Sequence, residues 1–290
     1  MSAARKVAVV TGSNKGIGFA IVKELCAKFD GDVFVTSRDE GRGKAAVEEL
    51  KKLGFQPNFH QLDIDDESSV LRFKDYLKSE YGGLDVLVNN AAIAFKNDAT
   101  EPFSEQATLT MRTNFFNTLR FCNIIFPLLK PHARVVNVSS SVGHLRKIPG
   151  DDDVSVALRK KLSSSDLTVE ELVKMIEDFV KAAQTGNHQK LGWPNSAYST
   201  SKIGISALTR IQQKAFDHDS REDIVVNSVH PGYVDTDMTS HKGPLTIEQG
   251  AVAPSWLALL PSNIKEPKGG YVWYEKQIVD WVNGPVPTAI

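Results

Sequence analysis

A tyrosine and a lysine four residues apart form the pair best suited to proton transfer in this 290-residue chain. Tyr198 and Lys202 lie in a segment, 195–208, whose pattern predicts a helix. Four residues make about one helical turn, so the phenol and the ammonium should project from one face. A cation fixed beside a tyrosine lowers the phenol's pKa from about 10 and lets it exchange a proton with a substrate oxygen near neutral pH. The pair alone is a weak signal, because such surface pairs also arise by chance.

The elements that must hold this pair alternate between short apolar runs and helical patterns. Strands are predicted at 7–10, 32–36, 58–63, 84–89, 134–138, 224–229 and 270–273, and helices at 19–29, 42–53, 68–81 and 109–129. Such alternation implies right-handed βαβ crossovers and a parallel sheet. The sequence therefore predicts an α/β fold: one doubly wound, Rossmann-like domain over residues 1–290.

Residues 144–192 interrupt this alternation just before the tyrosine. Thr168 and Glu171 have the spacing of a capping box that begins a helix. The predicted helix carries one apolar stripe, made of Leu172, Met175, Ile176, Phe179 and Val180. The stripe must pack against this chain or against another one, and we expect the former.

The turn after the first predicted strand is rich in glycine and leads directly into a helix. Glycine permits a tight turn and lets the backbone approach a phosphate, while the helix N-terminus offers free N–H groups. This position between a strand and a helix makes the turn a dinucleotide fingerprint rather than a plain loop. The predicted cofactor contacts are Gly12, Ser13, Asn14, Lys15, Gly16, Ile17 and Gly18.

The end of the second predicted strand selects between the two nicotinamide cofactors. An acidic residue there binds the ribose 2′-OH and repels a 2′-phosphate, whereas an arginine does the reverse. The chain has Ser37 and Arg38 at this point, and Lys15 adds a cation on the same side. Asp39 comes next, but its side chain should point the other way. We predict NADP(H); the alternative is that Arg38 and Lys15 are solvated surface charges.

Two further strand ends complete the predicted cofactor site. Asp63 ends the third predicted strand, where its carboxylate could accept a bond from the adenine amino group, and Ile64 follows it. Asn90 and Ala91 follow the fourth predicted strand, at the carboxyl edge where ligands bind in such sheets. All four residues are therefore predicted to contact the cofactor.

Bulk properties argue against several classes of partner. The formal net charge of −1 gives no overall attraction to nucleic acid or to an anionic membrane. No run of about 18 apolar residues could span a bilayer, and the first residues lead into a strand without a signal-peptide cleavage site, so a cytoplasmic address is expected. Cys26 and Cys122 lie in helical patterns and are expected to be free thiols rather than a disulfide. No metal site is predicted.

Together the motifs resemble those of the short-chain dehydrogenase/reductase superfamily. Thr-Gly-x-x-x-Gly-Ile-Gly, Asn-Asn-Ala, Asn-Val-Ser-Ser, Tyr-x-x-x-Lys and Pro-Gly occur in the family's order over nearly the whole chain. More narrowly, the chain looks like the cytosolic, monomeric NADPH-dependent carbonyl reductases, through segments 14–18, 59–66, 81–90, 113–116, 188–194 and 257–261. Those reductases carry a helical insertion over the surface that other members use to form tetramers. The resemblance thus implies a monomer.

The resemblance also implies roles for individual residues. Tyr198 is the general acid, and Lys202 lowers its pKa and binds the nicotinamide ribose. Asn114 resembles the helix asparagine that holds a water linking the lysine to bulk solvent. Ser140 would hydrogen-bond the substrate carbonyl; Ser139 and Ser141 are adjacent alternatives. Pro231, Gly232, Val234 and Thr236 should close over the carboxamide and the phosphates.

The substrate is less determined. Trp193, Tyr233 and Met238 are candidate walls around the polar centre, and such a pocket suits hydrophobic aldehydes, ketones and quinones. The resemblance therefore implies carbonyl reduction by hydride transfer from NADPH. A more selective hydroxysteroid or prostaglandin dehydrogenase is the alternative, followed by a non-catalytic NADP(H)-binding protein. His230 is either a structural histidine or a substrate contact.

Overall fold

The structure is a computed structural model that describes residues 5–96 and 98–287. Within this part of the chain the strands are β1 (Val7–Val10), β2 (Asp32–Ser37), β3 (Asn58–Gln61), β4 (Leu84–Asn89), β5 (Leu129–Val138), β6 (Val225–Val229), β7 (Tyr271–Val272) and β8 (Ile278–Val279). They form one sheet in the order β3-β2-β1-β4-β5-β6-β7-β8. All neighbours pair in parallel except β7 and β8.

The antiparallel β8 corrects the prediction of a wholly parallel sheet. β7 and β8 are separated by only five residues, 273–277. A connection that short can join two strands only as a hairpin, whereas a parallel pair needs a long crossover. The rest of the predicted α/β fold, a doubly wound parallel sheet, is confirmed by the observed strand order.

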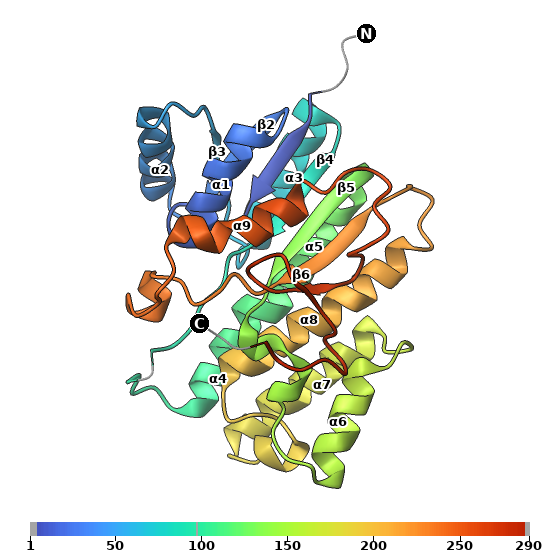
Figure 1. Cartoon of the computed structure of the whole chain (residues 1–290). Helices are drawn as coiled ribbons and strands as arrows, with labels where there is room; N and C mark the ends of the chain where they lie inside the picture. The colour runs from blue at the N-terminus through green and yellow to red at the C-terminus, as the bar shows by residue number, and fades with distance from the viewer. Residues whose placement is uncertain (1–4, 97, 288–290) are drawn as a thin grey trace.

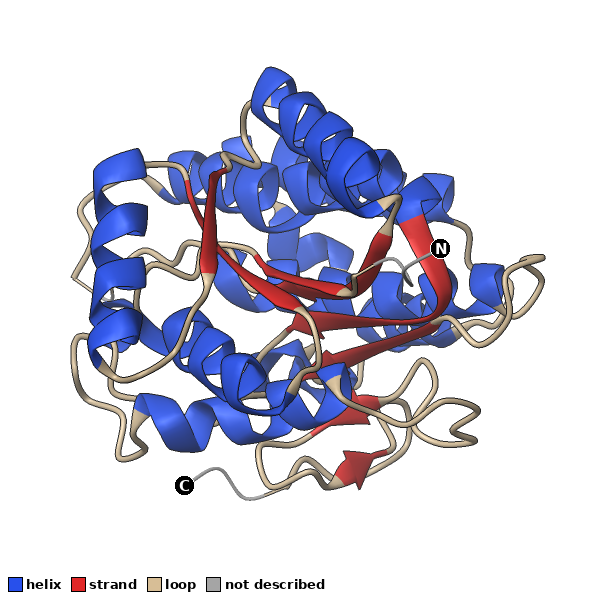
Figure 2. Cartoon of the chain, turned by 90° about the horizontal axis from the view of Figure 1, so that it is seen from above, coloured by secondary structure: helices blue, strands red, loops and turns tan. Residues whose placement is uncertain are grey.

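Helices cover both faces of the sheet, as Figures 1 and 2 show. They are α1 (Gly16–Lys28), α2 (Glu40–Lys52), α3 (Glu67–Tyr81), α4 (Phe103–Met111), α5 (Thr118–Ile125), α6 (Asp153–Ser163), α7 (Val169–Gln184), α8 (Ala197–Phe216) and α9 (Ile247–Ala258). The two layers follow from strand alternation. In β1, Ala8 and Val10 pack into the cluster under α1 and α9, whereas Val7 and Val9 pack into the cluster under α3 and α5.

The helix predicted at 109–129 differs from the one observed. It begins earlier, as α4, passes through a π-helical turn at Arg112–Asn117 and continues as α5, and β5 then starts at Leu129. A π-helical turn inserts an extra residue into the helix and is frequent at functional sites. Here Asn114 lies in that turn and binds the backbone of Ile93, a contact between distant segments that helical periodicity cannot reveal.

The insertion packs against the body of its own chain. Thr168 and Glu171 form the expected capping box, with N–H···O distances of 3.2 and 3.1 Å. Leu172, Ile176 and Phe179 of α7 are fully buried. They share a cluster with residues of α4 and α8, so the apolar stripe is covered within the chain.

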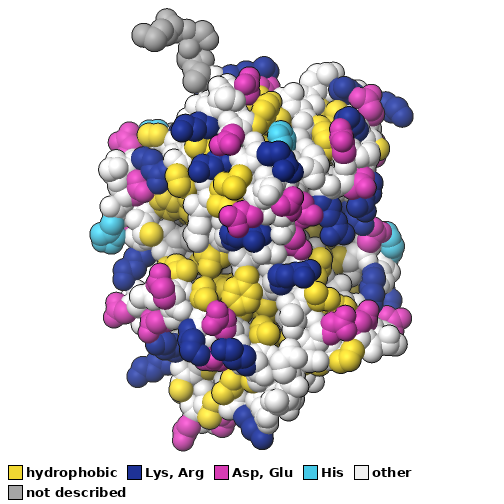
Figure 3. Space-filling model, turned by 180° about the vertical axis from the view of Figure 1, so that it is seen from behind, with side chains coloured by type: hydrophobic (Ala, Val, Ile, Leu, Met, Phe, Trp, Pro, Cys, Tyr) yellow, Lys and Arg dark blue, Asp and Glu magenta, His cyan; other side chains and the backbone are white. Residues whose placement is uncertain are grey.

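Both cysteines, Cys26 and Cys122, are free thiols, as expected. No helix in residues 5–96 and 98–287 combines the length and apolarity needed to cross a membrane. On the face shown in Figure 3, basic and acidic side chains are interspersed, and neither sign of charge covers the face.

Candidate functional site

A cavity of about 650 Å³ lies at the carboxyl ends of the central strands. The glycine turn after β1, the end of β2 and the segments after β3 and β4 line one part of it. Tyr198 and Lys202 of α8 and the segment after β6 line the other part. The cavity therefore lies where ligands bind in open α/β sheets, beside the reversal of strand order between β1 and β4.

Tyr198 and Lys202 occupy the first two turns of α8. Ser196 caps this helix by accepting a hydrogen bond from the Ser199 N–H at 3.2 Å. The Lys202 Nζ lies 5.6 Å from the centroid of the Tyr198 ring and donates to the Val138 carbonyl at 2.7 Å. The helix thus presents both groups to the cavity from one face, as their spacing predicts.

Burial shifts the pKa values of both ionisable groups. It raises the pKa of Tyr198 to about 12, and the Ser140 hydroxyl, which hydrogen-bonds the phenol, offsets only part of this rise. Burial lowers the pKa of Lys202 to about 8. The lowering of the phenol's pKa by Lys202 stays a prediction: the ammonium lies over the Tyr198 ring and bonds the Val138 carbonyl. A neutral phenol nevertheless holds the proton that a general acid must donate.

The structure distinguishes Ser140 from Ser139. Ser140 caps a short 3-10 turn, Ser141–Gly143, and its hydroxyl reaches the phenol of Tyr198. Ser139 is buried, with its hydroxyl 3.2 Å from the Lys202 carbonyl oxygen and 2.8 Å from Ser206 Oγ. Ser139 lines the cavity and Ser140 does not, but of the two only the Ser140 hydroxyl acts on the phenol of Tyr198.

Asn114 does not line the cavity but links two elements that do. Its Oδ1 accepts from the Ile93 N–H at 2.8 Å, and its Nδ2 donates to the Ile93 carbonyl at 2.9 Å and to Ser201 Oγ at 3.1 Å. The buried amide thereby ties the segment after β4 to α8, which carries the tyrosine and the lysine.

The predicted glycine turn lines the cavity with one exception. Gly12, Asn14, Lys15, Gly16, Ile17 and Gly18 all face it. Gly12 has φ +60°, and a Cβ there would lie 3.0 Å from Ala91, so glycine fits both the turn and its neighbour. Ser13 is the exception: its buried hydroxyl donates to the Val10 carbonyl at 2.8 Å and accepts from the Thr36 N–H at 3.0 Å. Ser13 joins β1 to β2 and has no side-chain contact with the cavity.

Arg38 lines the cavity together with Arg42, a residue that the sequence analysis missed. Their spacing of four residues is the signal that could have indicated the second arginine. Asp39 instead caps α2 by accepting from the Arg42 N–H at 2.7 Å, which removes the complication of an acid next to Arg38. Lys15 forms an ion pair with Asp237 at 2.5 Å. Arg42 also pairs with an acid, Asp39, but at the longer distance of 3.6 Å, so Lys15 and Arg42 are both candidates for the second cation beside Arg38.

The remaining predicted cofactor residues divide into two groups. Asp63, Ile64, Asn90, Ala91, Pro231 and Thr236 line the cavity. Asn90 holds the glycine turn, since its Nδ2 donates to the Thr11 carbonyl at 2.9 Å and to the Gly12 carbonyl at 3.1 Å. Gly232 and Val234 are not part of the lining. Val234 is buried and bridges to Leu245, which turns its side chain inward.

Of the three candidate substrate walls, Met238 alone lines the cavity. Trp193 is 2% exposed and packs edge-on against Phe179 at 5.8 Å, so it belongs to the apolar core of the insertion rather than to the cavity. Tyr233 is exposed outside the lining. His230 is buried against Trp273 with ring centroids 4.3 Å apart, and burial lowers its pKa to about 4. A neutral structural histidine is therefore the better reading of His230.

Charged groups that the sequence analysis missed hold the segment after β6 in place. Lys96 donates to the carbonyl of Asp237 and to Ser240 Oγ. His241 bridges Asp235 at 2.6 Å and Asp237 at 3.1 Å. The contacts within residues 235–241 are local, but Lys96 joins them from 141 positions away, which no local motif signals.

A second feature that the sequence analysis missed is a set of contacts that hold the turn carrying Ser140. The buried Tyr271 of β7 donates its hydroxyl to the Ser140 carbonyl at 2.5 Å. Trp281, which follows β8, donates its indole N–H to the Gly143 carbonyl at 2.7 Å. The C-terminal hairpin thus fixes both ends of the turn that carries Ser140.

Comparisons with known proteins agree with this geometry. The short chain dehydrogenase family model matches residues 6–150 and 184–244. Carbonyl reductase (NADPH) 1 of Bos taurus is 49% identical over 284 residues, covering 97% of this chain and 100% of that protein. Carbonyl reductase (NADPH) 3 of Homo sapiens is 46% identical over 282 residues with the same coverage.

A solved structure is also similar over most of its length. Salutaridine reductase from Papaver somniferum aligns with a TM-score of 0.80 and 31% identity, covering 92% of this chain and 99% of that one. The family model leaves out residues 151–183, which hold α6 and most of α7. It still matches well over half of the chain, and the relatives match nearly all of it. The chain belongs to the short chain dehydrogenase family.

Proposed function

We propose that this protein is an NADPH-dependent carbonyl reductase that converts aldehydes, ketones and quinones to alcohols. The observation that carries the proposal is the position of Tyr198 and Lys202 in the lining of a cavity whose other part holds the glycine turn and Arg38, with the Ser140 hydroxyl next to the Tyr198 phenol. The relatives named carbonyl reductase (NADPH) support the same reaction and cofactor.

The residues of the cavity fit NADP(H). The N-terminus of α1 has no side-chain cap, so its free N–H groups can bind phosphate oxygens. Arg38 and Arg42 can bind the 2′-phosphate, and Asp63 can bind the adenine amino group.

Arg38→Asp should reduce the preference for NADPH over NADH by about 1–3 kcal/mol, because a charge-assisted bond is lost and repulsion is added. An unchanged ratio of the two kcat/KM values would show that Arg38 does not contact the cofactor.

Each residue of the site then has a separate role in the reaction. When bound, NADPH supplies the hydride. Tyr198 donates its proton to the substrate oxygen, and Ser140 donates a hydrogen bond to that oxygen as it gains charge. Lys202 binds the nicotinamide ribose, and Asn114 positions α8. Met238 forms part of the apolar wall beside the polar centre.

We also propose one domain over residues 1–290, acting as a monomer on small-molecule substrates. The single sheet and the burial of the α7 stripe within the chain support this. A cytoplasmic address is supported by the two free thiols, since disulfides are rare in that compartment. Subcellular fractionation tests the address, and recovery in a secreted fraction would refute it.

A direct assay tests the activity. Purified protein mixed with NADPH and either menadione or an aromatic aldehyde should consume NADPH. Tyr198→Phe should lower kcat by roughly 10²–10⁴-fold because the proton donor is removed. Tyr76→Phe, which removes a phenol that is not part of the cavity lining, is the matched control and should keep the full rate. Binding of NADPH without turnover across a broad carbonyl panel would refute the reductase.

A further inference from the structure

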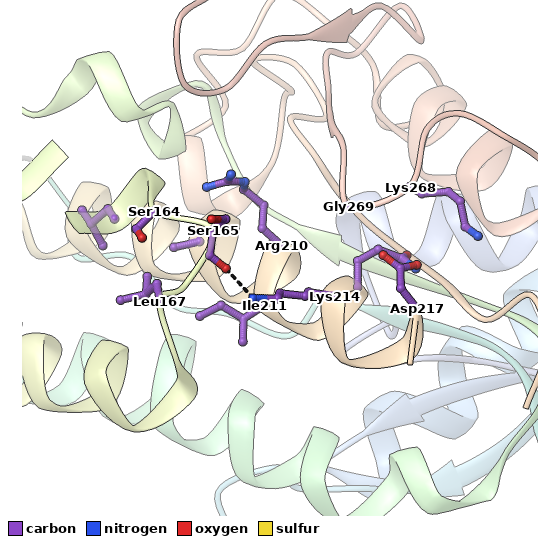
Figure 4. A pocket seen from close by; sticks show the side chains of 12 residues that line it. Ser164, Ser165, Leu167, Arg210, Ile211, Lys214, Asp217, Lys268 and Gly269 are labelled. Carbon is purple, nitrogen blue, oxygen red and sulfur yellow. Dashed lines mark hydrogen bonds between the residues drawn. The ribbon is translucent and has the colours of Figure 1, made fainter. Parts of the chain in front are cut away.

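A second cavity, of about 220 Å³, lies between the insertion and the C-terminal half of α8 (Figure 4). The end of α6 and the loop after it form one wall, α8 forms another, and the loop before β7 closes the third side. None of its lining residues lines the cofactor cavity. Lys202 and Arg210 are eight residues apart on α8, so about 12 Å of helix axis separates the catalytic turn from this cavity.

The cavity carries an excess of positive charge. Arg210, Lys214 and Lys268 line it, against a single carboxylate, Asp217. That carboxylate already accepts a hydrogen bond from the Gln213 amide at 2.9 Å. The lining itself holds three cations and one carboxylate, and Asp166, which lies outside the lining but 3.8 Å from Lys214, reduces the local excess to +1, which still favours an anion.

The cations are held in place by neutral partners. The Arg210 Nη1 donates to the Ser163 carbonyl at 3.1 Å, and its guanidinium lies 5.5 Å from the Trp281 ring centroid. The Lys214 Nζ donates to the Ser165 carbonyl at 2.8 Å, and a carboxylate, Asp166, comes no closer to it than 3.8 Å. These neutral partners orient both donors toward the loop after α6, and Lys214 also forms a longer ion pair with Asp166.

The rest of the lining is part apolar and part hydroxyl. Leu162, Leu167 and Ala207 are buried and form an apolar floor. Ser164 and Ser165 are exposed at the rim and supply two hydroxyl groups. Figure 4 shows these serines on the same side of the cavity as Arg210, with Lys268 on the far side. An occupant that satisfies both parts must combine a charged group with a short apolar body.

We propose that this cavity binds a small organic phosphate, with the phosphate against Arg210 and Lys214 and the apolar body on the leucine floor. A phosphate monoester near neutral pH carries up to two negative charges and accepts several charge-assisted hydrogen bonds. The planar guanidinium of Arg210 suits bidentate binding of such a group. The site lies outside the machinery of carbonyl reduction and ties the insertion to α8.

Calorimetric titration with phenyl phosphate tests the proposal. The protein is first saturated with NADP⁺, so that the probe cannot bind in the cofactor cavity. Inorganic phosphate and phenol, the two halves of the probe, are titrated separately. Phenyl phosphate should bind at least tenfold more tightly than either half.

Variants locate the binding. Lys214→Gln and Lys268→Gln should each weaken phenyl phosphate binding severalfold, and Arg210→Gln more than tenfold. Lys174→Gln, which removes an exposed lysine of α7 outside the cavity, is the matched control and should not change the affinity. The two lysine variants decide the question if Arg210→Gln fails to fold, since Lys214 and Lys268 are exposed. Equal affinity of the control and the lysine variants, or phenyl phosphate binding no tighter than inorganic phosphate, overturns the proposal.

Discussion

Burial gives the two ionisable residues of the catalytic pair different protonation states at high pH. The pKa of Tyr198 is raised to about 12, so the phenol keeps its proton across the working range. The pKa of Lys202 is lowered to about 8, so this cation is the group that titrates first. The charge at the site therefore depends on pH through the lysine.

The first prediction concerns the pH dependence of reduction. Lys202 is charged below about pH 8 and neutral above it. Because kcat/KM reports the free enzyme's ionisations, kcat/KM for a carbonyl substrate should fall as pH rises through about 8. Initial rates from pH 6 to 10 at saturating NADPH measure this. A profile that stays level to pH 10 would contradict the assigned role of Lys202.

The second prediction concerns Tyr271. Replacing it by phenylalanine removes the bond to the Ser140 carbonyl, so the catalytic turn should lose its fixed position. We expect kcat to fall about tenfold, since small misplacements of catalytic groups are costly, while KM for NADPH changes little. Steady-state kinetics with a melting curve separate this positioning role from a loss of fold. A lower melting temperature with an unchanged kcat would refute the positioning role.

These residues differ in how far the sequence could reveal them. Tyr198, Lys202 and Ser140 lie in short motifs whose spacing and order carry the information. Tyr271 contacts Ser140 across 131 positions, and nothing near it in the chain indicates that contact. Trp193 shows the opposite failure: an aromatic residue near the catalytic tyrosine in sequence is buried with α7 instead.

At the scale of elements, local signals were enough for the insertion helix but not for the helix before β5. The α7 capping box and apolar stripe are both local spacings, and both are present in the structure. The π-helical turn at 112–117 depends on Asn114 binding a distant loop, so periodicity predicted one continuous helix. β7 lies within the strand predicted at 270–273, but β8, and with it the hairpin, was missed, because a strand of two residues carries no alternation pattern.

The third prediction measures what α7 contributes to stability. Phe179→Ala should lower the free energy of unfolding by about 3–5 kcal/mol, because a fully buried ring leaves a cavity among α4, α7 and α8. Thr168→Ala should cost about 0.5–2 kcal/mol through loss of the helix cap. Urea denaturation measures both, with the exposed Lys181→Ala as control. If Phe179→Ala lowers the free energy of unfolding no more than the control does, the apolar stripe of α7 is not packed against α4 and α8.

At the scale of the whole molecule, the strand order sets where the cavity lies, and the α7 stripe packs within the chain. The chain reverses its direction of winding between β1 and β4, and Tyr198, Lys202 and the glycine turn line the cavity at that crevice. The alternation of strands and helices was enough to predict this crevice. Oligomeric state is harder to predict, because a stripe such as that of α7 reads the same in sequence whether it packs within the chain or between chains.

The last prediction therefore concerns assembly. The side chains of Leu172, Ile176 and Phe179 are already buried against α4 and α8 of the same chain, so they offer no surface to a second copy. The large apolar side chains still exposed on the insertion, Val154, Val156 and Leu191, are few, and stable homo-oligomers need a larger apolar interface. Light scattering should give a mass near 31.9 kDa that does not change with concentration. Phe179→Asp, which would expel α7 from its site, should increase association. A stable tetramer of the unmodified protein would mean that the insertion does not block the surface used for assembly.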